Sequence, residues 1–372
     1  MIIWECEKCR KRWYYPVEKC IFCKSDLRAV SSTKFTVKGV TVVHVPSPEH
    51  DRVPYYELLL NDEHCNTCIK KSFENYKIGD TIDLDSIETG AYQAQKQKKI
   101  GIMGTGLMGK QLAQFFSQNG YPVMLYSRTK DGSIKAMKKI EKSLSKTMDP
   151  QEIEIVINRI EPTDDLSRLK DAELIIESVI EDLEIKKQLF GALSSICQKD
   201  AIIATNTSSL PITKLATFVS HPERFIGMHF FNPVSKMHLV EVVYGLDTSR
   251  ETIEYITNFS DELGKTPILV KDSPGFIVNR SLMPFINEAA SLLQEGVLPD
   301  DIDNAIKLGL NHPMGPLALA DLIGLDICVY IMKTLYKGFD DARYIPSPKF
   351  YELISKGHLG KKAGKGFYNY SI

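Results

Sequence analysis

Two residues of this chain, His229 and Glu241, are of types that can together move a proton. His229 ends one short β-rich run, and Glu241 enters the next. Histidine has a pKa near neutrality, so its ring can take a proton from a hydroxyl and return it. A carboxylate bonded to the ring fixes its tautomer and stabilises the imidazolium. The pair suits oxidation of a secondary alcohol with loss of hydride, although a lone His229 would be typical of a structural histidine.

A glycine-rich motif, G-x-G-x-x-G, stands between an apolar run at 100–103, which follows Lys98 and Lys99, and an amphipathic stretch at 110–119. In dinucleotide-binding folds its glycines permit a tight turn, close approach of a pyrophosphate, and packing of helix on strand. A second apolar run at 123–126 follows at βαβ distance, which favours this interpretation over an ordinary glycine-rich turn. The predicted cofactor contacts are Gly104, Gly106, Leu107, Met108 and Gly109.

The turn after the second apolar run bears on the choice of cofactor. NAD-binding enzymes place Asp or Glu here, where the carboxylate accepts from the adenine ribose and repels a 2′-phosphate. In this chain the position is Ser127, followed by the cations Arg128 and Lys130, which can pair with phosphate. We therefore expect NADP rather than NAD. The alternative is that both cations are solvated turn residues while Ser127 binds the ribose of NAD.

Four cysteines near the N-terminus form two C-x-x-C pairs. They are Cys6, Cys9, Cys20 and Cys23. Two such pairs on facing turns supply the four thiolates of a closed tetrahedral site suited to structural zinc. An iron site of rubredoxin type is the main alternative, because four sulfur ligands do not by themselves choose the metal.

A further C-x-x-C, Cys65 to Cys68, falls on a predicted loop and has no second pair. Metal ligation together with His64 and a redox role are both possible functions, but a pair of reduced loop cysteines is the simpler interpretation. Cys197 and Cys328 stand in apolar, helical contexts and are interpreted as core residues.

Apolar runs and turn residues divide the chain into predicted domains. After the zinc ribbon at 1–30, short β-rich runs at 31–88 indicate a small OB-like β-barrel, and 89–98 is a polar linker. Between 99 and 278 apolar runs alternate with helical stretches, which predicts a doubly wound Rossmann sheet. Apolar residues three and four apart indicate an all-α domain at 279–372. The predicted fold class is therefore α/β with these additions.

The composition argues against several kinds of partner. A net charge of −1 gives no electrostatic reason to expect nucleic acid or an anionic membrane. OB folds can bind single strands, but the barrel region carries many acidic residues among its lysines. No signal peptide and no run long enough to span a bilayer is visible, so we expect a cytoplasmic protein.

From Lys98 to Tyr370 the chain resembles the L-3-hydroxyacyl-CoA dehydrogenase family. The motifs that carry the resemblance occur in family order: NTSSL at 206–210, GMHFFNP at 227–233, LVEVV at 239–243, DSPGFIVNR at 272–280, MGP at 314–316 and GKKAGKGFY at 360–368. The resemblance implies reversible interconversion of (S)-3-hydroxyacyl-CoA, with butyryl length expected, and 3-oxoacyl-CoA. Another β-hydroxyacid dehydrogenase is the alternative, but such enzymes typically use a catalytic lysine.

The resemblance also implies roles for individual residues. His229 would be the acid/base, Glu241 would orient it, and Ser208 and Asn279 would bind the substrate oxygen. The residues implied on the nicotinamide side are Glu181, Lys186, Asn232 and Lys362, and those implied at the phosphates of coenzyme A are Ser143 and Lys146. Members of the family form homodimers through the helical domain, so a homodimer is expected.

The N-terminal region resembles the ribbon-plus-OB domains that accompany acyl-CoA thiolases. This resemblance implies a thiolase as a partner, to which the dehydrogenase would pass 3-oxoacyl-CoA. A protein that only presents acyl-CoA to a thiolase, with a degenerate dehydrogenase half, is the alternative. The intact set His229, Glu241, Ser208 and Asn279 argues against degeneracy.

Overall fold

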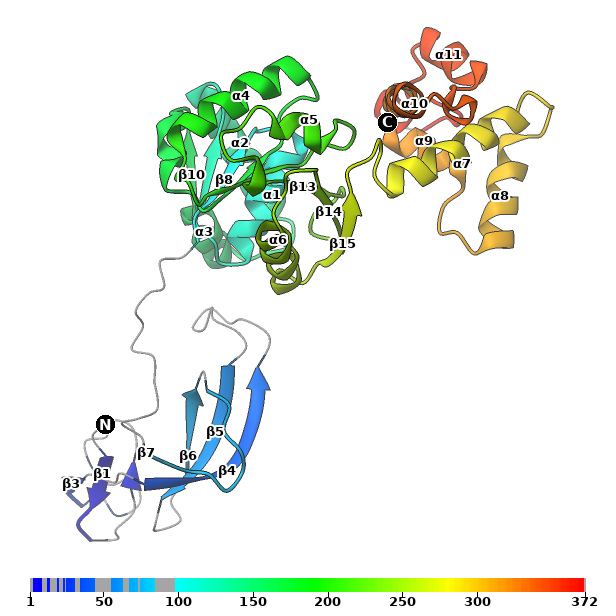
Figure 1. The fold of residues 1–372 in the computed structure, drawn as a ribbon. Helices are drawn as coiled ribbons and strands as arrows, with labels where there is room; N and C mark the ends of the chain where they lie inside the picture. Colours follow the sequence, from blue (N-terminus) through cyan, green and yellow to red (C-terminus); the bar gives the residue numbers. More distant parts are fainter. Residues whose placement is uncertain are drawn as a thin grey trace. The chain divides into compact units, whose positions relative to one another are not determined.

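The computed structural model describes residues 3–8, 12–13, 19, 23, 25–30, 34–43, 55–62, 67–72, 74–83 and 98–370. The chain divides into two compact units, Met1–Gln97 and Lys98–Ile372 (Figure 1). Each unit is described by itself below.

The described residues of the N-terminal unit form two antiparallel sheets. In the first, β1 (Ile3–Cys6) lies between β2 (Arg12–Trp13) and β3 (Leu27–Val30). This sheet brings Cys6 close to Cys23, with 3.4 Å between the two Sγ atoms. Cys9 and Cys20, the other two predicted metal ligands, lie outside the described residues. Among the residues that are described, no cluster of three or more metal-ligating side chains occurs.

The second sheet has the strand order β6-β5-β4-β7. These strands are β4 (Lys34–Val43), β5 (Tyr55–Asp62), β6 (Thr67–Ser72) and β7 (Thr81–Asp83). Strand β4 continues through a bulge between Val37 and Gly39. Cys68 lies in strand β6 rather than in the predicted loop, and Cys65 is outside the described residues. Barrel closure is not seen in the described part of this unit and remains a prediction.

An eight-stranded sheet forms the first half of the second unit, with the order β10-β9-β8-β11-β12-β13-β14-β15 (Figure 1). The strands are β8 (Ile100–Met103), β9 (Val123–Tyr126), β10 (Ile160–Thr163), β11 (Leu174–Glu177), β12 (Ile202–Thr205), β13 (Phe225–Phe230), β14 (Leu239–Tyr244) and β15 (Thr266–Lys271). The first six strands in this order run parallel, and β14 and β15 run opposite to them.

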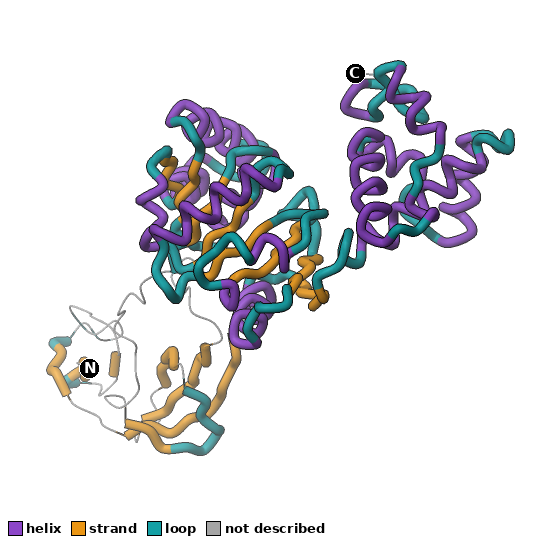
Figure 2. Tube along the Cα trace, turned by 45° about the horizontal axis from the view of Figure 1, so that its top comes forward, coloured by secondary structure: helices purple, strands orange, loops and turns teal. Residues whose placement is uncertain are grey.

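Helices cover both faces of this sheet, as Figure 2 shows. One face packs on α1 (Leu107–Gln118), α2 (Lys130–Leu144), α3 (Pro150–Asn158) and α6 (Arg250–Glu262), and the other packs on η1 (Leu166–Asp171), α4 (Leu183–Ile196) and α5 (Ile212–Ala216). A short 3-10 turn, η2 (Pro222–Arg224), precedes β13. Because side chains alternate along a strand, neighbours such as Ile102 and Met103 enter opposite cores. The Rossmann arrangement and the helical domain expected from the sequence are confirmed.

The second half of this unit is helical. Its elements are α7 (Val278–Leu292), α8 (Pro299–Leu310), α9 (Pro316–Ile323), α10 (Leu325–Phe339), η3 (Ala342–Tyr344), α11 (Pro348–Ser355) and η4 (Lys361–Ala363). Apolar faces of α7, α9, α10 and α11 share one core. Cys328 is fully buried in it, which raises the pKa of its thiol to about 12 and agrees with its interpretation as a core residue.

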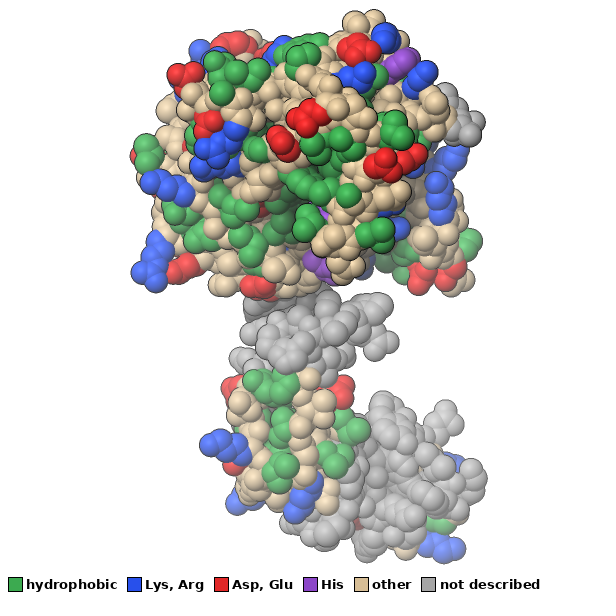
Figure 3. Space-filling model, turned by 90° about the vertical axis from the view of Figure 1, so that its right-hand side faces the viewer, with side chains coloured by type: hydrophobic (Ala, Val, Ile, Leu, Met, Phe, Trp, Pro, Cys, Tyr) green, Lys and Arg blue, Asp and Glu red, His purple; other side chains and the backbone are tan. Residues whose placement is uncertain are grey.

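The surface of the second unit carries charges of both signs. On the face drawn in Figure 3, acidic and basic side chains are interspersed. Among the described helices, none is both long enough and apolar enough to cross a bilayer.

Candidate active site

Cross-strand pairing places His229 beside Glu241. Strands β13 and β14 are antiparallel, and their register sets these two residues directly opposite each other. The His229 Nδ1 and Glu241 Oε2 atoms are 2.7 Å apart. Both side chains are buried, with 7% of His229 and 1% of Glu241 exposed, and the rings of Phe231 and Phe276 contact the imidazole. Two residues that are separate in sequence therefore form one buried pair.

The carboxylate of Glu241 determines the tautomer of His229. Glu241 Oε1 accepts hydrogen bonds from the backbone N–H groups of Ile277 (2.9 Å) and Val278 (3.0 Å), at the start of α7. Three donors thus hold the carboxylate. Because a carboxylate only accepts, Nδ1 of His229 carries the hydrogen and Nε2 has the lone pair. Nε2 is the atom that can remove a proton from a substrate hydroxyl.

Ser208 and Asn279 come together beside the pair from two different domains. Asn279, in the first turn of α7, donates from Nδ2 to the backbone oxygen of Ser208 at 3.3 Å. Ser208 follows strand β12, and the neighbouring Asn206 accepts from the N–H of Phe230 through Oδ1 at 2.8 Å. Within 98–370 the Ser208 hydroxyl makes no hydrogen bond to protein. Its hydroxyl is therefore available to a ligand.

Glu181 holds the turn that carries Ser208. Its Oε1 accepts from the Ser208 N–H (3.1 Å) and the Ser209 hydroxyl (2.8 Å), and also from the hydroxyl of Thr207. Burial opposes ionisation of Glu181, but Lys186 and these donors outweigh it and lower the pKa of the carboxyl. Glu181 thus contacts the predicted substrate-binding turn.

Lys186 is buried in an ion pair that the sequence analysis did not foresee. Its Nζ lies 2.6 Å from each carboxylate oxygen of Glu177 and 3.3 Å from Glu181 Oε2. Glu177 also accepts from the Thr205 hydroxyl and the Val179 N–H, each at 2.6 Å. A glutamate ending an otherwise apolar strand was the available signal, because a fully buried carboxylate needs a partner. Lys186 is therefore held in a buried ion pair and is not exposed on the face of α4.

The glycine-rich turn has the shape that a pyrophosphate requires. Gly104 has φ +111°, and a Cβ there would lie 2.5 Å from the Ser178 backbone oxygen. A Cβ at Gly109 would lie 2.0 Å from the Gly104 oxygen, whereas Gly106 faces open space. Helix α1 begins at Leu107 with no side-chain cap, so its first N–H groups remain available to an anion. The residues fit a dinucleotide, with Met108 in the same first turn.

The turn after β9 presents Ser127, Arg128 and Lys130 at the surface. Ser127 lies near Thr105 of the glycine-rich turn, with 3.5 Å between the hydroxyl oxygens. Arg128 and Lys130 are exposed. Neither cationic group pairs with another described residue of the unit. Their charges are therefore available to an anionic ligand.

Four further sequence-predicted residues lie at separate places. Lys362, in η4, is bound by Asp326 through both carboxylate oxygens, at 2.6 and 2.7 Å, so its charge is already paired within the helical domain. Ser143 is exposed on α2, and Lys146 follows the end of that helix rather than lying on it. Asn232 is exposed after β13, where it contacts Gln111 of α1.

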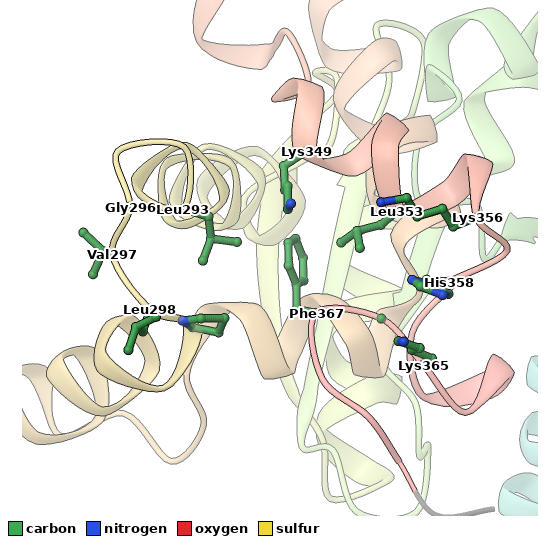
Figure 4. Close-up of a pocket in the computed structure, with 12 residues that line it drawn as sticks. Leu293, Gly296, Val297, Leu298, Lys349, Leu353, Lys356, His358, Lys365 and Phe367 are labelled. Carbon is green, nitrogen blue, oxygen red and sulfur yellow. The ribbon is translucent and has the colours of Figure 1, made fainter.

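Two hollows of about 430 Å³ each lie on the helical domain. The one in Figure 4 lies between α11, the C-terminal segment and the loop before α8, and its lining includes Lys349, Lys356, Lys365 and Phe367. It contains none of the predicted site residues. The other is lined in part by Phe276, whose ring contacts His229, but neither His229 nor Glu241 lines it.

The doubly wound sheet, the open glycine turn and the His–Glu pair define a nucleotide-binding dehydrogenase. Residues 99–273 match the family model "3-hydroxyacyl-CoA dehydrogenase, NAD binding domain", and residues 275–370 match "3-hydroxyacyl-CoA dehydrogenase, C-terminal domain". The chain therefore belongs to the 3-hydroxyacyl-CoA dehydrogenase family, and it is an NAD-binding oxidoreductase. Both matches begin after the N-terminal unit.

Individual proteins of this family align over nearly their whole length. The chain is 46% identical over 277 residues to a probable 3-hydroxybutyryl-CoA dehydrogenase of Deinococcus radiodurans, covering 73% of this chain and 100% of that protein. It is 44% identical over 280 residues to the 3-hydroxybutyryl-CoA dehydrogenase of Clostridioides difficile, covering 73% and 99%. The crystal structure of (S)-3-hydroxybutyryl-CoA dehydrogenase PaaH1 from Ralstonia eutropha has a TM-score of 0.71 and 41% identity, covering 74% and 100%.

Proposed function

We propose that this chain interconverts (S)-3-hydroxybutyryl-CoA and acetoacetyl-CoA. The observation that carries the proposal is the buried His229–Glu241 pair, whose free Nε2 lies on the ring side away from the carboxylate. The names of the two relatives and of the solved enzyme support the short acyl length.

Each residue of the site has a role in this reaction. His229 Nε2 removes the proton of the 3-hydroxyl during oxidation and returns it during reduction. Glu241 keeps the tautomer and stabilises the imidazolium that forms. The Ser208 hydroxyl and the Asn279 amide bind the substrate oxygen. The bound nicotinamide cofactor accepts or supplies the hydride.

An assay of purified protein tests this function. Acetoacetyl-CoA is offered with NADH and, separately, with NADPH, and the loss of absorbance of the reduced cofactor is followed. We expect turnover of the thioester but not of free acetoacetate. No turnover with either cofactor would refute the proposed activity.

NADP is proposed as the preferred cofactor. The support is Arg128 and Lys130, whose charges are exposed and unpaired within the described second unit, beside a Ser127 that brings no negative charge to repel a phosphate. A wild-type enzyme that prefers NADH would refute this preference.

Coenzyme A is proposed to bind with its phosphates near Ser143 and Lys146. Partial burial and the charge of Lys139, which precedes Ser143 on α2 by four residues, lower the pKa of Lys110. A bound phosphate would relieve that repulsion. Replacing Lys146 by Met should raise the KM for acetoacetyl-CoA and leave the KM for acetoacetyl-pantetheine, which has no nucleotide, unchanged.

We also propose that Cys6, Cys9, Cys20 and Cys23 bind one zinc ion in the cytoplasm, where thiols remain reduced. The approach of Cys6 and Cys23 supports a shared site. Metal analysis of the wild type and of a Cys6→Ser, Cys9→Ser variant tests it. Stoichiometric iron, or zinc retained by the variant, would refute the assignment.

The N-terminal unit is proposed to dock a thiolase, and the helical domain is proposed to form a homodimer. Exposed leucines on and beside α8 support self-association, because 64% of Leu298, 86% of Leu308 and 59% of Leu310 is exposed. Co-purification from the source cell with and without residues 1–90 tests docking. Recovery of thiolase by the truncated form would refute it, and light scattering decides the oligomeric state.

A further inference from the structure

The loop that joins the two strands of the His–Glu pair is held by side chains from outside it. This loop, residues 231–238, connects β13 with β14. Lys265 donates from Nζ to the backbone oxygens of Val234 (2.6 Å) and Met237 (3.0 Å). Gln111 of α1 forms two further hydrogen bonds with the loop. Helix α1, which begins at the glycine-rich turn, is therefore linked directly to the loop between His229 and Glu241.

In both hydrogen bonds of the Gln111 side chain, the donor and the acceptor can be assigned. The backbone N–H of Val234 donates to Gln111 Oε1 at 2.7 Å, and a backbone N–H can only donate. The carbonyl of Gln111 must therefore face Val234, so its amide nitrogen faces Asn232. Gln111 Nε2 donates to Asn232 Oδ1 at 2.8 Å. This bond in turn directs the oxygen of Asn232 toward Gln111 and leaves Asn232 Nδ2 without a protein partner among residues 98–370.

The position of Asn232 indicates what its Nδ2 meets. Gln111 is in the second turn of α1, whose uncapped start suits the pyrophosphate. Asn232 follows the carboxyl end of β13, and ligands of doubly wound sheets bind at that edge. For hydride to reach a substrate held at His229, the nicotinamide half must extend from the pyrophosphate toward His229. Asn232 links these two places, because it follows the strand that carries His229 and is bonded to α1.

We propose that Gln111 is a positioning residue that fixes the amide of Asn232 so that it offers a hydrogen-bond donor to an acceptor oxygen on the nicotinamide half of the cofactor. This inference rests on the proposed function, in which a nicotinamide cofactor supplies the hydride. The N–H of Val234 fixes which end of the Gln111 amide faces it. The bond from Gln111 Nε2 to Asn232 Oδ1 then fixes which end of the Asn232 amide is left for the cofactor.

A Gln111→Glu substitution keeps the shape of the side chain but replaces the donor that faces Asn232 with an acceptor. One carboxylate oxygen still accepts from Val234, but the other now accepts from Asn232, whose amide turns and presents its oxygen. Gln111→Met removes both bonds without adding charge. Gln114→Glu is the matched control, because Gln114 lies on the same helix and bonds only Gln118, at 3.4 Å, through its side chain.

The experiment measures binding of reduced cofactor without substrate, together with binding of ADP, which has the pyrophosphate but no nicotinamide half. Where NADPH is the better cofactor, ADP carrying a 2′-phosphate replaces ADP. We expect Gln111→Glu to weaken reduced-cofactor binding about tenfold. Gln111→Met should weaken it less, and Gln114→Glu should leave it unchanged. ADP should bind equally well to all four proteins.

Equal weakening of ADP and reduced cofactor by Gln111→Glu would overturn the proposal, because it would mean that the new charge repels the pyrophosphate directly. Equal behaviour of Gln111→Glu and Gln114→Glu would also overturn it. As a second route, Asn232→Asp presents an oxygen while Gln111 is intact, and it should match the loss seen with Gln111→Glu. Turnover of acetoacetyl-CoA by the wild type is measured separately, so failure of the proposed function is distinguishable.

Discussion

The proposed substrate end and the proposed adenine end of the nucleotide-binding domain are built in opposite ways. At the substrate end, Glu241 is buried and holds three hydrogen-bond donors, so one geometry and one tautomer of His229 are fixed. At the adenine end, Arg128 and Lys130 are exposed and their charges are unpaired within the described second unit. Proton transfer needs a preorganised pair, whereas recognition of a phosphate needs a cation that a ligand can reach.

The largest expected effect is at His229. His229→Ala should lower kcat by about two to four orders of magnitude while cofactor binding is kept, because general acid–base catalysis is lost. Steady-state kinetics and cofactor titration measure the two quantities. His221→Ala, which removes an exposed histidine paired with Glu223, is the control. Near-normal turnover in His229→Ala would remove His229 from the mechanism.

A Glu241→Gln substitution tests the tautomer. The backbone N–H groups of Ile277 and Val278 require an acceptor, so the glutamine oxygen faces them and its NH₂ faces His229. Nδ1 must then accept, which places the hydrogen on Nε2, the atom that should take the proton. We expect kcat to fall by about one to three orders of magnitude. A loss confined to KM would contradict this account. The exposed Glu254→Gln is the control.

At the adenine end the expected effect is smaller. Charge-assisted bonds from Arg128 to a 2′-phosphate are worth roughly 1.5–3 kcal/mol, so Arg128→Ala should lower kcat/KM for NADPH by about one to two orders of magnitude and change NADH little. Lys135→Ala, which removes an exposed cation paired with Asp131, is the control. Equal losses with both cofactors would show that this turn does not bind the phosphate.

The smallest expected effect is a pH dependence of stability from Glu181. Its folded pKa lies below the ordinary value of 4.5, so its stabilising contribution is present above that pH and is lost as the pH falls through the folded pKa. Denaturant unfolding of wild type and Glu181→Gln at about pH 6 and about pH 3 measures this. The wild type should lose more stability than the variant, and the control Glu184→Gln should behave like wild type. Parallel losses in Glu181→Gln would contradict the assignment.

Part of the fold could be predicted from the sequence. The glycine motif and the alternation of apolar runs predicted the Rossmann fold, because both follow from local backbone and burial requirements. Strand β10 and strand β6 were not foreseen: β10 includes Pro162 and two exposed residues, and β6 is largely polar. Neither presents the apolar run that indicates a strand.

The polar contacts that position the site were the hardest to foresee. The Glu177–Lys186 pair joins the end of β11 to α4, and Gln111 of α1 reaches a loop more than a hundred residues later in the chain. Such bonds depend on the three-dimensional packing of the sheet and leave no periodic pattern in the sequence. Lys362 shows the opposite case. The family motif indicated a contact with the nicotinamide side of the cofactor, whereas the structure pairs its charge with Asp326 in the helical domain.

The stereochemistry of the reaction tests the central claim most directly. Purified wild-type protein is given (S)- or (R)-3-hydroxybutyryl-CoA with the oxidised form of its better cofactor, and formation of reduced cofactor is followed. The proposed interconversion of (S)-3-hydroxybutyryl-CoA and acetoacetyl-CoA predicts that the S enantiomer is oxidised and that the R enantiomer is left unreacted. Equal oxidation of both enantiomers, or of neither, would contradict the account.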